Sequence, residues 1–364
     1  MRRCPKALLL FVLVGPLALF SAGCEPSSPD ASTMAGDGEA AAIESPDGFT
    51  DHFHPRASLT LEETEEVINV TPIVSVARDG RFVIADPREI QVRTYDPEGH
   101  LITAFGREGS GPGELKAPMS AVALTGDTLV VGDFAGSRIH FFTSGGDSLL
   151  RSVEAPVFPL YGFRSMDDHR LLLFGRERRG AVPRLLHVFD LESETIERSF
   201  FELPVSKAVR PYAVSLGWVD VAMRGDTLAA VFSLTDTVYV FHPDGDSRAD
   251  ERIPLPFSAF SFEAPDRASL TDARARNEWM QKIHTIDRIE WLESGHFVIQ
   301  FGRSEDAGRR HALLGLTRSG GRLFEIDDTP RLLTVHDDRF LFVHPQSLTE
   351  NRWLIASLSD PDGS

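Results

Sequence analysis

The sequence is poor in cysteine and in basic residues. Only Cys4 and Cys24 are present among 364 residues, so the chain can form neither a disulfide framework nor a cysteine-rich zinc site. Lys and Arg number 37 against 54 Asp and Glu, which gives a formal charge of −17. A chain this acidic cannot neutralise phosphates broadly, so nucleic acid is excluded as a general partner.

The hydrophobic run at the N-terminus is too short to span a bilayer. Residues 7–20 are apolar apart from Gly15 and Pro16, and three basic residues precede them; this pattern is typical of a signal peptide. Small residues 21–23 then lead into Cys24, a pattern that resembles a bacterial lipobox. It implies cleavage before Cys24 and acylation of that residue. The alternative is an ordinary secretory signal followed by an incidental cysteine.

Three regions follow from this interpretation. Residues 1–23 are the signal peptide, and 24–57 are the lipidated cysteine with a flexible linker rich in Pro, Ser, Ala and Gly. Residues 58–364 are the folded domain. Removal of the signal leaves 34 basic and 54 acidic side chains, so the mature chain has a formal charge of −20.

The folded part contains a repeat. A short apolar strand recurs six times, and the first residues of successive copies lie 47, 42, 57, 69 and 43 positions apart. These copies are Phe82–Asp86, Leu129–Asp133, Leu171–Phe174, Leu228–Val231, Phe297–Gln300 and Phe340–Val343. A second strand with alternating residues follows each, ending at a polar turn in the manner of a hairpin: Val92–Tyr95, Ile139–Phe142, Leu186–Phe189, Val238–Phe241, Leu313–Leu316 and Leu354–Leu358.

Four strands per repeat and six repeats predict a β-propeller. Further strands flank most copies, for example Val74–Ala77 and Leu101–Phe105. A period of 40–50 residues with four antiparallel strands is typical of propeller blades. We expect the strand Ser58–Glu63 to supply the outer strand missing from the last blade and so to close the ring. A two-sheet β-sandwich or two smaller domains are the alternatives.

One stretch resembles a known family. Residues 105–115 (FGREGSGPGEL), the strand 129–133 and residues 138–142 (RIHFF) resemble the NHL-type repeat, most clearly in the first two blades. The chain from about Ser58 is similar to bacterial six-bladed β-propeller lipoproteins of that group. The resemblance implies the fold and an envelope location, and it implies little about chemistry.

Some relatives of this architecture are metal-dependent lactonases or lyases, which hold a metal with Glu, Asn, Asp or His at the channel mouth. Asn69, Asn277 and Asn351 do not fall at equivalent blade positions, so no ligand set carries over. The pair His52 and His54 could bind a metal or could be ordinary surface histidines. No catalytic residue, metal ligand or cofactor is therefore predicted.

Two other segments have two interpretations each. The loop Gly109–Gly113 can bind an anion through its backbone N–H groups, or its glycines can simply permit a tight path between blades. Between the fourth and fifth blades, Ser269 and Asp272 form a capping box at the start of a helical insertion spanning about residues 263–283. This helix either packs on a blade edge or covers the channel mouth.

Charge is unevenly distributed among the predicted loops. In a propeller the loops between second and third strands lie on the same face as the connectors between blades. Those segments together contain 19 basic and 15 acidic residues, against a charge of −24 for the rest of the mature chain. A relatively basic face favours an anionic ligand or partner segment. The candidate ligand-binding residues are Arg107, Arg138, Arg178, Arg210, Arg303 and Arg309.

The sequence therefore predicts a lipid-anchored protein of the bacterial cell envelope, exposed to the periplasm or at the cell surface. We expect a non-catalytic binding or scaffold protein. Its membrane contact is the lipid anchor, and its ligand is a protein, a peptide or a small anion. The alternative is a lactonase-like hydrolase or lyase that depends on a metal.

Overall fold

The computed structural model describes residues 48–63, 73–177, 183–205, 210, 213, 217–242, 248–256, 272, 274–275, 278, 284–305, 308–345 and 351–359, with the backbone alone at 303–305 and 308–309. Residues 45–264 and 283–364 form one unit, and residues 1–44 with 265–282 form another. Each unit is described by itself.

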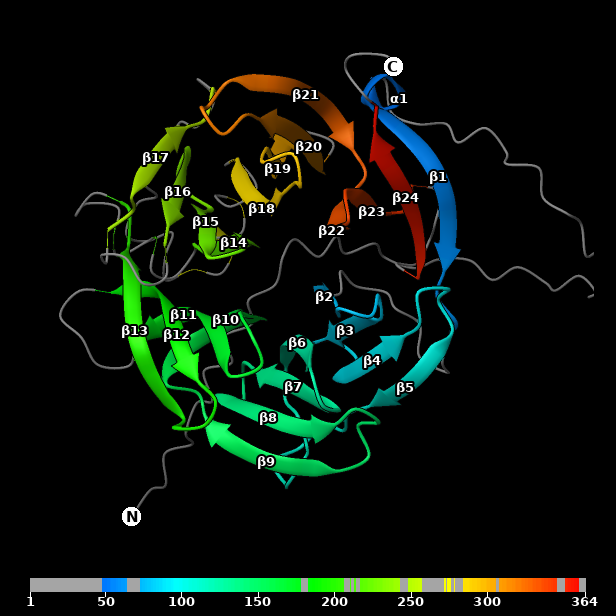
Figure 1. The fold of residues 1–364 in the computed structure, drawn as a ribbon, viewed down its shortest axis with the longest axis vertical. Coiled ribbons are helices and arrows are strands. Elements are labelled where there is room, and N and C mark those ends of the chain that lie inside the picture. The colour runs from blue at the N-terminus through cyan, green and yellow to red at the C-terminus, as the bar shows by residue number, and fades with distance from the viewer. Residues whose placement is uncertain are drawn as a thin grey trace, which may run out of the picture. The chain divides into compact units, whose positions relative to one another are not determined.

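The larger unit is a six-bladed β-propeller of four-stranded antiparallel sheets (Figure 1). Blade 1 contains β2 (Ile73–Val76), β3 (Phe82–Asp86), β4 (Gln91–Tyr95) and β5 (Leu101–Phe105). Blade 2 contains β6 (Pro118–Leu124), β7 (Thr128–Asp133), β8 (Arg138–Thr143) and β9 (Leu149–Glu154). Blade 3 contains β10 (Val157–Ser165), β11 (Arg170–Glu177), β12 (Arg184–Asp190) and β13 (Thr195–Glu202).

The second half of the ring continues this pattern. Blade 4 contains β14 (Val219–Arg224), β15 (Thr227–Phe232), β16 (Thr237–Phe241) and β17 (Glu251–Pro254). Blade 5 contains β18 (Thr285–Trp291), β19 (Phe297–Glu305), β20 (Gly308–Leu316) and β21 (Arg322–Thr329). Blade 6 contains β22 (Leu332–His336), β23 (Arg339–Val343), β24 (Arg352–Leu358) and, as its outer strand, β1 (Phe53–Thr60).

The six apolar copies found in the sequence are the second strands of the six blades. They read as almost continuous apolar runs because each blade packs against a neighbour on both faces, and β3 is buried at all five of its positions. The cores lie between blades. Between blades 1 and 2, for example, Val83 and Ala85 pack with Ala121 and Val131.

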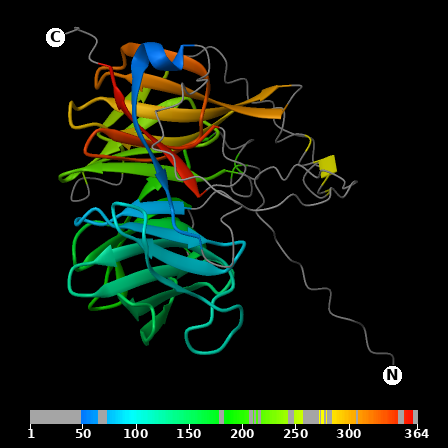
Figure 2. The ribbon, with the colours of Figure 1, turned by 90° about the vertical axis from the view of Figure 1, so that its right-hand side faces the viewer.

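The ring is closed by the N-terminal strand, as predicted, but at a different place. Strand β1 pairs antiparallel with β24 from Phe53 opposite Leu358 to Thr60 opposite Arg352, and Figure 2 shows the two side by side. The prediction of Ser58–Glu63 for this strand was therefore wrong. A register irregularity between Pro55 and Ala57 accommodates the proline in this edge strand. Residues 53–57, which were assigned to the linker, therefore belong to the blade.

Aromatic packing anchors the closing strand. Helix α1 (Phe49–His52) leads directly into β1, and the rings of Phe49 and Phe53 stack with centroids 4.9 Å apart. Phe53 is fully buried, and its ring also meets those of Phe340, at 4.8 Å, and Phe342, at 5.6 Å. The His52 ring packs on Phe324 of blade 5 at 5.4 Å, which gives half of the predicted His-x-His pair a packing role.

The predicted helical insertion is helical at the residues that the structure describes, namely Arg274, Ala275 and Glu278. The Asp272 carboxylate accepts the Ala275 N–H at 2.8 Å, which is the geometry of an N-cap residue. Ser269 lies outside the described residues. Within the described part of the chain, no helix is long and apolar enough to cross a membrane.

The packing of Phe53 predicts that ring closure contributes strongly to stability. Phe53→Ala should lower the free energy of unfolding by about 3–5 kcal/mol, since it removes a large side chain from a filled core. His54→Ala is the matched control, because the neighbouring side chain is exposed. Urea unfolding followed by tryptophan fluorescence measures both, and a similar small loss in the two variants would show that β1 does not hold the ring.

Candidate functional site

The first strand of each blade forms one edge of its sheet and lies nearest the axis in Figure 1; in blade 6 this strand is β22. The connectors between blades begin at the outer strands and return to these inner strands. The hairpins between second and third strands lie on the same side, which we call the connector face. The hairpins between first and second strands lie on the opposite face.

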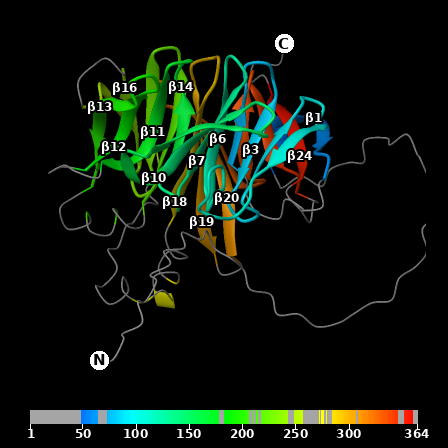
Figure 3. The ribbon, with the colours of Figure 1, turned by 90° about the horizontal axis from the view of Figure 1, so that it is seen from below.

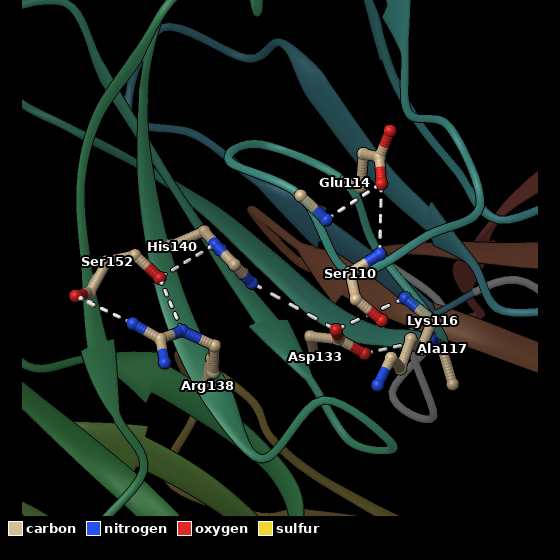
Figure 4. Close-up of polar contacts among 9 residues, drawn as sticks. Ser110, Glu114, Lys116, Ala117, Asp133, Arg138, His140 and Ser152 are labelled. Carbon is tan, nitrogen blue, oxygen red and sulfur yellow. Dashed lines mark hydrogen bonds and ion pairs between the residues drawn. The ribbon is translucent and has the colours of Figure 1, made fainter.

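The glycine-rich loop between blades 1 and 2 is filled by its own carboxylate. Glu114 accepts the backbone N–H groups of Ser110 at 2.9 Å and Gly111 at 2.7 Å (Figure 4). It also pairs with Arg107. The Gly111 N–H and the Arg107 guanidinium lower the pKa of Glu114. The loop does have the geometry that binds an anion, and in this structure the anion is the carboxylate of Glu114 itself.

The aspartates that end the second strands of blades 1 and 2 organise the connector face. Asp133 accepts the backbone N–H groups of Lys116 at 3.1 Å and Ala117 at 2.8 Å, so it fixes the connector that enters blade 2 (Figure 4). Asp86 is buried and pairs with the buried Arg93 at 3.2 Å. The motif residues of these two blades are therefore occupied in holding the fold.

The six candidate arginines do not form one described cluster. Arg107 is exposed and paired with Glu114, while Arg138 donates to the hydroxyl of Ser152 at 2.8 Å and to its carbonyl at 3.2 Å. Arg178 lies outside the described residues, and so do the residues directly before and after Arg210 in the sequence.

Arg303 and Arg309 lie on the longest hairpin of the connector face. Strands β19 and β20 extend beyond the neighbouring strands in Figures 2 and 3. Their register puts Arg303 directly opposite Arg310, and Arg309 opposite Ser304 on the next rung. Arg310 reaches Asp328 at 3.2 Å. Like charges opposed across a strand pair disfavour the pairing, so the facing pair Arg303 and Arg310 favours a negative charge nearby. Arg309 is on the adjacent rung, which faces the other side of the ladder, and the rung after it pairs Glu305 with Gly308.

Buried histidines occupy equivalent third-strand positions in blades 2 and 3. His187 is fully buried, with Nδ1 2.8 Å from the Ser199 hydroxyl and Nε2 3.2 Å from the Gly175 carbonyl. His140 lies 3.0 Å from the Ser152 hydroxyl and 4.0 Å from Asp133 (Figure 4). Burial lowers the pKa of both imidazoles. Both histidines are core residues; both ring nitrogens of His187 have partners within its blade, whereas Nε2 of His140 has no hydrogen-bond partner among the described residues.

A second polar cluster lies on the inner strands, and the sequence analysis missed it. Arg164 of β10 donates Nε to the Val221 carbonyl at 2.8 Å and Nη2 to Asp220 of β14 at 3.5 Å. The other oxygen of Asp220 accepts the backbone N–H of Ile289, in β18, at 2.9 Å. One set of contacts thus connects blades 3, 4 and 5.

Glu290 completes this axial cluster, which we define as Arg164, Asp220, Arg288 and Glu290. Its carboxylate lies 3.7 Å from Arg288 Nη1, and Thr334 of β22 hydrogen-bonds to it. Burial raises the pKa of Glu290, while Arg164 and Arg288 act in the opposite direction. No short motif could reveal this cluster, because its members come from three strands that the sequence places far apart.

Metal chemistry finds no support among the described residues. They contain no group of three or more His, Cys, Asp or Glu side chains that could hold a metal ion. Of the predicted His-x-His pair, His52 packs on Phe324 and His54 is exposed on β1.

The buried histidines predict a loss of stability in acid. Because burial lowers the pKa of His187 below its ordinary value of 6.5, the unfolded chain takes up a proton that the folded chain resists. The contribution of His187 is therefore complete above pH 6.5 and is lost as the pH falls below it. In His187→Gln the fall in unfolding free energy should be shallower, by at most about 1.4 kcal/mol per pH unit.

His100→Gln supplies a control of opposite sign. Asp96 raises the pKa of His100, so this exposed residue adds stability at low pH, and the added stability is lost as the pH rises through its folded pKa. Its removal should steepen the acid decline slightly. Urea titrations between pH 5 and about 8 measure both variants, and a His187→Gln profile parallel to that of the parent would contradict the assignment.

The sequence matches no protein-family model and no curated protein. Among solved structures, that of a "putative exported protein" from Bacteroides fragilis gives a TM-score of 0.55 at 13% identity, over 84% of this chain and 95% of its own. Virginiamycin B lyase from Staphylococcus aureus gives 0.47 at 12% identity, over 84% and 100%. At these identities the similarity is one of fold alone.

Proposed function

We propose that this protein is a non-catalytic binding or scaffold module of the bacterial cell envelope that recognises an anionic ligand or partner segment at its connector face. A propeller is a rigid frame whose loops can vary, and such loops commonly carry recognition. The fold similarity to the Bacteroides fragilis protein is compatible with a location outside the cytoplasm.

The observation that carries this proposal is the register of the β19–β20 hairpin. Arg303, Arg309 and Arg310 occupy two adjacent rungs at the end of the hairpin, and Arg303 faces Arg310 directly. Guanidinium groups bind carboxylates and phosphates through paired hydrogen bonds, which makes the facing pair Arg303 and Arg310 suited to an anionic partner. The acidic body of the protein keeps such a partner away from other surfaces.

The test uses a fluorescein-labelled acidic peptide, hexaglutamate, and fluorescence anisotropy at low ionic strength. The double variant Arg303→Ala/Arg309→Ala should weaken binding about tenfold or more, because rim charges act chiefly through electrostatic attraction. Added salt should weaken binding by the parent protein in the same direction. Inorganic phosphate as competitor distinguishes a small-anion site from a peptide surface.

A matched control removes two arginines from the opposite face. Arg81 and Arg339 lie at hairpins between first and second strands, so Arg81→Ala/Arg339→Ala changes the net charge equally without touching the connector face. It should bind the peptide as the parent does. Equal loss in both double variants, or no peptide binding at all, would overturn the proposed connector-face site.

We also propose that the protein is anchored through Cys24, which lies outside the described residues. Acylation after cleavage of residues 1–23 provides several acyl chains, and each buried methylene contributes about 0.8 kcal/mol to membrane binding. The described propeller begins at α1, so the segment between Cys24 and Phe49 serves as the tether.

Expression in a bacterial host with detergent phase separation tests the anchor. The parent protein should partition into the detergent phase of Triton X-114 and incorporate labelled palmitate. Cys24→Ser should appear in the aqueous phase without label. Cys4→Ser is the control and should behave like the parent, because Cys4 is removed with the signal. An unlabelled parent protein in the aqueous phase would favour the ordinary secretory signal instead.

A further inference from the structure

The axial cluster has two features that suit it to a ligand: its charges lie on the innermost strands, and its arginines keep unused hydrogen-bond donors. Its four charges lie on the innermost strands, where the side chain of Arg164 is 25% exposed and that of Glu290 is 10% exposed. The side chains of Asp220 and Arg288 are 15% and 14% exposed, so all four charges are mostly buried and Arg164 reaches solvent most. The contacts with Asp220 and Glu290 orient the two arginines.

Many of these donors are unused. A guanidinium group carries five N–H donors. Within the described part of the chain, Arg288 has its ion pair with Glu290 at 3.7 Å and no hydrogen bond. Arg164 uses Nε for the Val221 carbonyl and Nη2 for a long contact with Asp220. The arginines are thus oriented by neighbours without being saturated by them.

The cluster is built from other residues than the proposed connector-face site. Arg164 and Glu290 are each the penultimate residue of an inner strand, whereas Asp220 is the second residue of β14, so the cluster lies along the depth of the inner strands. It does not include the β19–β20 hairpin, so separate variants test the two sites.

Protonation favours the binding of a negative charge. The cluster contains two arginines and two carboxylates, so it is neutral when all four groups are ionised. Burial raises the pKa of Glu290, and uptake of a proton there leaves a net charge of +1 beside two rigid guanidinium groups. Fixed donors of this kind match the paired oxygens of a carboxylate or phosphate.

We infer that Arg164 and Arg288 form a binding site for one small oxyanion, a carboxylate or a phosphate, on the inner strands of blades 3 and 5, with Asp220 and Glu290 as positioning residues. This site is independent of the proposed connector-face function. An anion there would accept unused N–H groups of both arginines, one from blade 3 and one from blade 5.

Isothermal titration calorimetry with the purified full chain tests the site. The probes are succinate and inorganic phosphate, each at an ionic strength matched with sodium chloride, and the stronger binder identifies the class of oxyanion. Arg288→Lys keeps the positive charge beside Glu290 but loses the planar fork, so affinity should fall about tenfold. Arg322→Lys, on the outer strand β21, should bind as the parent does.

A second variant separates ligand binding from a merely structural role. Glu290→Gln keeps the shape of the side chain and removes the competing negative charge. We expect it to bind the probe several-fold more tightly and to lose the dependence of affinity on pH that the parent shows. A purely structural ion pair would not produce tighter binding when one partner is neutralised.

Opposite results would overturn this inference. If neither probe binds the parent protein, the cluster only links blades. The same conclusion follows if Arg288→Lys and Glu290→Gln both bind the probe as the parent does. Retention of probe binding in Arg303→Ala/Arg309→Ala would confirm that the axial site is separate. Loss of probe binding there would assign the oxyanion to the connector face and reject the axial site.

Discussion

The pairing of β1 with β24 is the constraint on which the rest of the ring depends. Each blade buries its faces against two neighbours, and the core between blades 6 and 1, which contains Leu59 of β1, is incomplete while the ring is open. The closing pair joins residues about 300 positions apart, from Phe53 opposite Leu358 to Thr60 opposite Arg352. Bringing such distant segments together costs chain entropy, and the aromatic cluster around Phe53 offsets that cost at the junction.

Closure also determines where the chain leaves the propeller. Helix α1 ends at His52 and β1 begins at the next residue, so the described chain enters the propeller at the outer strand of blade 6. The buried Phe49 and Phe53 lie at that point of entry, and they protect the β1–β24 ladder from being peeled from its end.

The fold could be predicted because its strongest signal has a simple physical origin. Second strands such as β3 and β7 are buried on both faces, and continuous apolar runs mark them plainly. Outer strands are partly exposed, and β1 contains Pro55 at an irregularity, so its start could not be found from alternation. Strand β10 has two register shifts against β11, which conceal the first strand of blade 3 in the same way.

The candidate site was less predictable because its side chains act across blades. Arginines in loops are visible in a sequence, but their partners are not. The structure shows that Arg107 hydrogen-bonds to Glu114 and Arg138 to Ser152. The glycine-rich loop is not available to an external anion, since Glu114 occupies the N–H groups that such an anion would need. Arg164 and Asp220 are 56 residues apart, and only the packing of neighbouring blades brings them together.

The axial cluster carries a desolvation cost that the apolar cores between blades do not have. Removing charged groups from water is expensive, and an apolar set of similar volume would stabilise the ring as well or better. The sheets of blades 4 and 5 show this alternative, since Ile286 and Ile289 of β18 pack with Val231 in an apolar core. On the same strand, Arg288 and Glu290 face other neighbours and remain charged and incompletely hydrogen-bonded. Stability alone does not explain that contrast along a single strand, and this contrast is the reason for proposing a ligand that takes the unused donors.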